Sequence, residues 1–147
     1  MQVIDNKALL LNVRNPNKIT TVIPKSKDLG EGKVLVHWNL EESQVLKNLK
    51  IRNVPSPILG KYAWTGLYKP FEHQKDTAAF LTLHRRAFCF NDPGTGKTLS
   101  ALWAADYLMS RGLVRRCLIL CPLSIMHSAW MSDLNNSIIH RSAIVAH

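Results

Sequence analysis

Asn91-Asp92-Pro93-Gly94-Thr95-Gly96-Lys97-Thr98 is the stretch of this chain on which the expected fold depends. An apolar run, 87–90, precedes it, and a run with helical spacing, 99–109, follows it. Strand, glycine-rich turn and helix in this order predict a loop that wraps its backbone N–H groups around a phosphate group. Gly94 and Gly96 permit the tight wrapping, and the start of the helix adds the positive end of its dipole.

Two side chains at the end of this loop are the candidates for nucleotide chemistry. Lys97 is expected to reach the terminal phosphates of a bound nucleotide, and the Thr98 hydroxyl is expected to ligate Mg²⁺. The alternative is a glycine turn with a solvated lysine, and the flanking strand and helix favour the phosphate-binding loop over it.

The composition is that of a globular protein with a positive charge. The chain has 147 residues, of which 46% are hydrophobic, and 19 Lys and Arg against 10 Asp and Glu give a formal net charge of +9. This charge suits a nucleic-acid partner, although a solvated basic surface has the same composition. Cys89, Cys117 and Cys121 lie in apolar runs, which predicts reduced thiols in a cytoplasmic protein. No apolar run reaches membrane-spanning length, so no membrane partner is expected.

The chain is expected to have two parts that meet in a turn-rich stretch, 51–67. Residues 1–65 are predicted to form a small α+β appendage, with strands at 7–13 and 33–38. A helix over 40–49 is expected to begin at Asn39 as its N-cap.

Residues 66–147 alternate between helical and strand patterns. Helices are expected at 70–84, 97–111 and 124–134, with strands at 87–90, 117–121 and 142–146. This alternation predicts βαβ units, and therefore a parallel sheet covered by helices.

Two further motifs flank the loop. Gln74 follows an aromatic and proline turn that contains Tyr68 and Phe71, and its amide matches the N6 and N7 edge of adenine. Alone it reads as an ordinary surface glutamine, but upstream of a phosphate loop it is expected to read adenine. In Cys121-Pro122-Leu123-Ser124, Ser124 is expected to cap a helix, and the helix start to hold a nucleic-acid phosphate. Trp130 is expected in the core rather than as a stacking platform.

In this order and spacing, Gln74, the phosphate loop and the Cys-Pro-Leu-Ser motif followed by Trp130 resemble the start of a superfamily-two helicase. The resemblance is to the Swi/Snf type, including helicase-like proteins carried by bacteriophages. The first loop position is Asn91 instead of glycine, and a residue other than glycine is common there in helicase-like ATPases. The resemblance covers residues 66–147 and implies the first part of a RecA-like P-loop NTPase lobe.

The resemblance also implies roles for single residues. Gln74 reads adenine, and DNA is contacted by Pro122, Leu123 and Ser124. Lys97 and Thr98 are the catalytic residues, with Thr98 on Mg²⁺. ATP and Mg²⁺ are the implied cofactors, DNA is the implied partner with duplex favoured, and the location is the cytoplasm, that of the host if a phage encodes the protein. The implied ATP-binding loop residues are Asp92, Pro93, Gly94, Thr95, Gly96, Lys97 and Thr98.

The family's Asp-Glu box and its second lobe have no counterpart in this chain. We therefore expect an incomplete lobe that binds ATP but hydrolyses it negligibly alone, with hydrolysis coupled to DNA translocation or unwinding in a longer protein. One alternative is a non-catalytic nucleotide- or DNA-binding module that acts with a completing partner chain. The other is a small metabolic kinase, which Asn91, Gln74 and the Cys-Pro-Leu-Ser motif disfavour.

Overall fold

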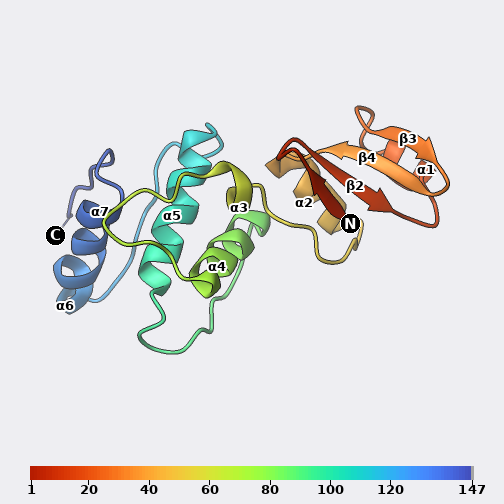
Figure 1. The fold of residues 1–147 in the computed structure, drawn as a ribbon. Coiled ribbons are helices and arrows are strands. Elements are labelled where there is room, and N and C mark those ends of the chain that lie inside the picture. Colours follow the sequence, from red (N-terminus) through yellow and green to blue (C-terminus); the bar gives the residue numbers. More distant parts are fainter. Residues whose placement is uncertain (147) are drawn as a thin grey trace. The chain divides into compact units, whose positions relative to one another are not determined.

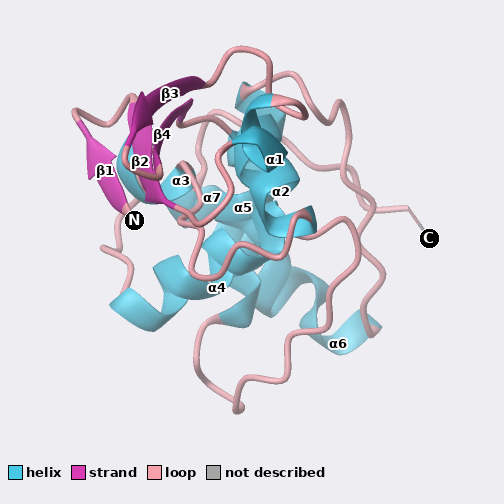
Figure 2. Ribbon diagram, turned by 90° about the vertical axis from the view of Figure 1, so that its right-hand side faces the viewer, coloured by secondary structure: helices cyan, strands magenta, loops and turns pink. Residues whose placement is uncertain are grey.

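The computed structural model describes residues 1–146 and divides into two compact units, Met1–Lys61 and Tyr62–His147 (Figure 1). The expected boundary was at residues 65 and 66. All strands of the described residues belong to the first unit, and the second consists of helices joined by irregular segments (Figure 2).

The first unit is built on a four-stranded antiparallel sheet with the strand order β1-β2-β4-β3. In the central pair, Leu9 lies opposite Val36 and Leu11 lies opposite Val34. Because alternate residues of a strand share a face, these four side chains point to one side of the sheet, where all are buried. The strands are β1 (Gln2–Ile4), β2 (Ala8–Asn12), β3 (Lys27–Gly30) and β4 (Lys33–His37).

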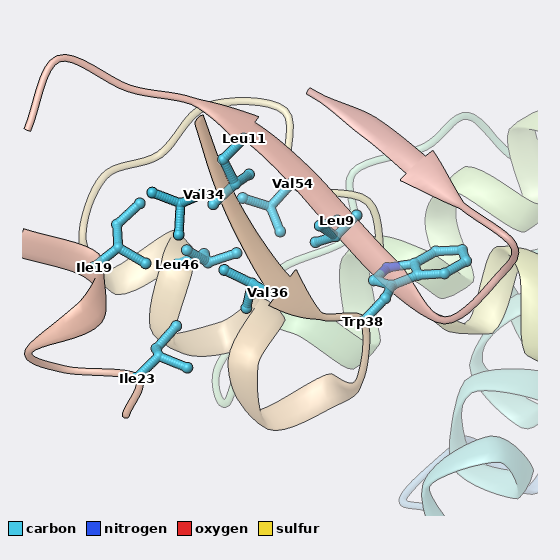
Figure 3. Close-up of a cluster of buried hydrophobic side chains, with 9 residues drawn as sticks. All are labelled: Leu9, Leu11, Ile19, Ile23, Val34, Val36, Trp38, Leu46 and Val54. Carbon is cyan, nitrogen blue, oxygen red and sulfur yellow. The ribbon is translucent and has the colours of Figure 1, made fainter. Parts of the chain in front are cut away.

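Helices cover this buried face and complete the core of the first unit. Figure 3 shows Ile19 of α1 and Leu46 of α2 directed towards the valines and leucines of the central strands. The helix α2 begins as expected, because the Asn39 side chain accepts a hydrogen bond from the Glu42 N–H at 3.0 Å. The Trp38 indole N–H donates to the Pro55 carbonyl at 2.9 Å, which fixes this ring at the edge of the core. The helices are α1 (Asn17–Thr20), α2 (Leu40–Asn48) and α3 (Ile58–Lys61).

The second unit is organised around the central helix α5. Trp103 and Leu102 of α5 pack with Leu134 and Ile138 in a small core that Trp130 also contacts, as expected for this tryptophan. The C-terminus of α5 also follows the prediction, because the Gly112 N–H bonds back to the Met109 carbonyl at 2.9 Å. No helix within residues 1–146 is long and apolar enough to cross a bilayer. The helices are α4 (Glu72–Leu83), α5 (Lys97–Ser110), α6 (Leu123–Ile125), η1 (Met126–Met131) and α7 (Ser132–Ser137).

The helix expected at 124–134 is longer and has a different start. The segments α6, η1 and α7 follow one another without interruption, and η1 is a π-helical turn. Pro122 occupies the N-cap position and no side chain caps this helix, so the prediction of Ser124 as N-cap is wrong. Proline suits a helix start because its missing N–H would have no partner inside the helix.

The expectation of a RecA-like domain with a parallel sheet is wrong. The runs 87–90, 117–121 and 142–146 form no strand, and the one sheet of the described residues is antiparallel and lies in the first unit. In the second run, Ile119 packs against the core while Leu118 and Leu120 are exposed. The apolar pattern marks residues that can enter a sheet, but a strand also requires a neighbouring chain segment, and that neighbour is not encoded locally.

Candidate functional site

The phosphate-loop candidate connects the irregular run 87–90 to α5 and depends on two glycines. Gly94 and Gly96 have φ angles of +80° and +74°, in the left-handed region that favours glycine. Gly96 is also the N-cap of α5. A Cβ atom at Gly96 would lie 1.9 Å from Nε2 of Gln74, so the loop and this glutamine approach as closely as glycine allows.

Lys97 folds back onto the loop that precedes it. Its Nζ donates hydrogen bonds to the carbonyl oxygens of Asn91 and Asp92, each at 2.8 Å. The Asp92 carbonyl also accepts from the Thr95 hydroxyl at 2.8 Å. Asp92 and Pro93 are exposed at the tip, and Thr98 is half-buried in the first turn of α5. The ammonium group and the N-terminal N–H groups of α5 therefore lie at the same loop, as an anion site requires.

Helix α4 fixes the loop through two hydrogen bonds. The Asn91 side-chain amide donates to the Thr77 hydroxyl at 2.8 Å. Nε2 of His73 lies 3.1 Å from the Thr95 carbonyl, and because a carbonyl only accepts, this ring nitrogen is the donor. The loop is thus held from the side of α4 before any ligand binds.

The structure assigns Gln74 a packing role. This side chain is buried, and its Oε1 accepts the Phe71 N–H at 2.9 Å, which caps the start of α4. Its amide nitrogen lies against Gly96. Phe71 and Tyr68 are exposed nearby, and the Phe71 ring stacks on His73 with centroids 5.6 Å apart. Adenine recognition by Gln74 stays a prediction. The amide group that would bind adenine already contacts the start of α4 and Gly96 of the loop.

The predicted DNA-binding residues Pro122, Leu123 and Ser124 lie together at the start of α6 and are exposed. Figure 1 shows this helix start and the loop before α5 towards the same end of the second unit. No hydrogen bond between the described residues joins the two places. The structure therefore brings Gln74 into contact with the loop, and among the described residues no hydrogen bond connects residues 122–124 to either of them.

A buried carboxylate cluster was not anticipated from the sequence. Asp106 of α5 accepts hydrogen bonds from the Tyr62 hydroxyl at 2.7 Å, Nε of Arg141 at 2.7 Å and Nε2 of His140 at 2.9 Å. Burial raises the pKa of Asp106, but the hydrogen bonds from Tyr62, Arg141 and His140 outweigh it and hold this pKa below its ordinary value. Burial, together with the bond to Asp106, raises the pKa of Tyr62.

The cluster joins three segments that are distant in the sequence. The only local signal for it was one acidic residue in the apolar run of α5.

The arrangement around Lys97 suits a polyphosphate. Within residues 1–146 no group of three or more His, Cys, Asp or Glu side chains is placed to hold a metal ion. No family model, curated protein or solved structure matches this chain.

Proposed function

We propose that this chain binds ATP with Mg²⁺ through residues 91–98, as the ATP-binding part of a Swi/Snf-like, helicase-type ATPase. The observation that supports ATP binding best is the Lys97 ammonium group, held at 2.8 Å against two loop carbonyls at the start of a 14-residue helix. Two glycines with left-handed backbone angles also support the proposal, because such angles occur in loops whose N–H groups surround an anion.

In this proposal the loop exchanges internal contacts for contacts with phosphate. Lys97 leaves the carbonyls of Asn91 and Asp92 and pairs with the terminal phosphate oxygens, while Thr98 contributes its hydroxyl to Mg²⁺. A charged hydrogen bond to phosphate is stronger than one to a neutral carbonyl, so the exchange favours the bound state.

Hydrolysis and DNA binding belong to the same proposal. The sequence has no acidic pair at the end of an apolar run after Ser124, so we propose that this chain alone hydrolyses ATP at a negligible rate. The exposed start of α6, with Ser124, is the proposed contact with DNA, through a phosphate at the helix N-terminus. The three free cysteines support a cytoplasmic location, that of the host if a phage encodes the protein.

The test is titration calorimetry of the full chain with ATP and Mg²⁺, comparing wild type with Lys97→Ala and with Lys69→Ala. Lys69 is an exposed lysine of the same unit outside the loop, so it controls for the change in net charge. Loss of one charged hydrogen bond, worth about 1.5–3 kcal/mol, predicts a Kd for Lys97→Ala raised by about 10- to 100-fold. Equal affinities for wild type and Lys97→Ala would contradict the proposal.

The alternative is a non-catalytic module that binds nucleotide or DNA and acts with a partner chain. Large side chains left exposed on the runs 87–90 and 117–121 favour it, because such surfaces usually become covered. ATP turnover by this chain alone that disappears in Lys97→Ala would exclude the alternative and contradict the expectation of negligible hydrolysis.

A further inference from the structure

Two aromatic side chains next to the phosphate loop are exposed to solvent. Phe88 and Phe90 are 82% and 89% exposed, and Cys89 between them is only half-buried. The two rings stack on each other with centroids 5.8 Å apart and planes within 15°. Because the two stacked rings are both exposed, their outer faces are open to solvent and can stack on another flat ring.

The same segment carries positive charge. Arg85 and Arg86 precede the rings, both are exposed, and neither guanidinium forms an ion pair within residues 1–146. Guanidinium groups suit phosphate because they offer several N–H donors in one plane, and they also stack on flat rings. Unneutralised arginines next to exposed aromatic rings are the combination that binds the backbone and the bases of a nucleic-acid strand.

An open cavity of about 310 Å³ lies beside the rings, and both aromatic and polar residues line it. Phe88 and Phe90 line it together with Phe80, and its polar lining comes from Asp76, Thr77 and Asn91. The Asp76 carboxylate repels a phosphate, but it can accept a hydrogen bond from an N–H group of a base, such as N3–H of thymine. This distribution of charged and polar groups suits a nucleic-acid strand whose bases face the cavity and whose phosphates face Arg85.

We propose that Phe88, Phe90 and the preceding arginines form a binding site for an unpaired nucleic-acid strand. The bases must be unpaired because a duplex buries the faces that stack on aromatic rings. The cavity also includes Asn91, whose carbonyl holds Lys97, so a bound strand lies in direct contact with the phosphate loop. The site does not depend on the proposed ATP binding and is tested in the absence of nucleotide.

The experiment is fluorescence anisotropy of the full chain with a labelled oligothymidine, its duplex with oligoadenosine, and an abasic strand of equal length. The variant Phe88→Ala/Phe90→Ala is compared with Leu118→Ala/Leu120→Ala, a matched control whose side chains are 84% and 87% exposed but not aromatic. Circular dichroism verifies that all variants keep the fold. We expect the single strand to bind more tightly than the duplex and the abasic strand.

Stacking worth about 1–3 kcal/mol per base predicts that the phenylalanine variant weakens single-strand binding by about 5- to 150-fold, with less than about twofold change in the control. Arg85→Ala/Arg86→Ala should lower the salt slope by about 1.4, from two lost phosphate contacts. Phe90→Trp should retain binding because it keeps a stacking ring.

Three outcomes would overturn the proposal. One is equal affinity of the wild type and the phenylalanine variant for the single strand. Another is equal binding of the abasic strand. The third is a wild-type dimer, seen by light scattering, that the phenylalanine variant abolishes without weakening strand binding, since the rings would then serve a second copy of the chain. Loss of ATP binding in Lys97→Ala is measured separately, so the two proposals fail independently.

Discussion

Replacing Asp106 by alanine should lower the free energy of unfolding of the second unit more than any other single polar substitution in α5. The carboxylate is buried and accepts three hydrogen bonds, from Tyr62, His140 and Arg141. Each hydrogen bond to a charged group contributes about 1.5–3 kcal/mol, but these do not add fully. The His140 and Arg141 side chains are 48% and 33% exposed, so water replaces part of what they lose.

We therefore expect Asp106→Ala to lower the free energy of unfolding by about 3 kcal/mol, the lower end of the range for breaking a buried ion pair. Asp106→Asn keeps the shape and one acceptor, so a smaller loss of about 1–2 kcal/mol is expected. Asp133→Asn is the control, because burial raises the pKa of Asp133 and the exchange removes a charge that burial disfavours. Its effect should be near zero or slightly stabilising.

The assay is urea unfolding of the full chain, monitored by tryptophan fluorescence and by circular dichroism. Trp64, Trp103 and Trp130 contact the core of the second unit, whereas Trp38 is in that of the first. A Trp38→Phe background therefore restricts the fluorescence signal to the second unit. A loss below about 1 kcal/mol for Asp106→Ala would refute the reasoning, because the hydrogen bonds would then contribute no more than exposed contacts.

Two further predictions concern pH and the loop. Because folding lowers the pKa of Asp106, this residue stabilises the fold above its unfolded pKa near 4, and the stabilisation is lost as the pH falls through the folded pKa. Because folding raises the pKa of Tyr62, this residue stabilises the fold below its unfolded pKa of about 10, and the stabilisation is lost as the pH rises through the folded pKa. Unfolding free energy measured from pH 2 to 11 should fall at both ends, and Asp106→Asn should flatten the acid side; an unchanged acid limb would contradict this. Gly96→Ala should cost about 2 kcal/mol, from its φ of +74° and the 1.9 Å approach to Gln74, and Gln74→Ala in the same chain should restore part of the loss. Strictly additive effects in the urea assay would show that the two residues do not compete for space.

Local signals predicted the features that depend on neighbours in the sequence. The cap at Asn39 and the end of α5 at Gly112 follow from backbone groups within a few residues. The position of Gly96 at the start of α5 belongs to the same class.

The predictions that are wrong, and the features that were not predicted, concern contacts between segments that are distant in the sequence. The run 117–121 has the composition of a strand, yet its side chains divide between the core and solvent, and residues 62–146 contain no strand that could pair with it. The partners of Asp106 are 34, 35 and 44 residues away, so no spacing in the sequence brings them together. Gln74 was expected to read adenine, and its hydrogen bond to Phe71 was not predicted because it depends on the side-chain conformation that the structure adopts.

The π-helical turn η1 gives the helix 123–137 room for a change in length. A π turn closes its hydrogen bonds one residue further along than an α turn, so Met126–Met131 holds what amounts to one inserted residue. His127 and Ser128 are exposed within it. Deleting one of them would let the segment continue as an α-helix while Leu134 and Ile138 keep their places in the core. This helix is therefore the place where the second unit can lose a residue without repacking.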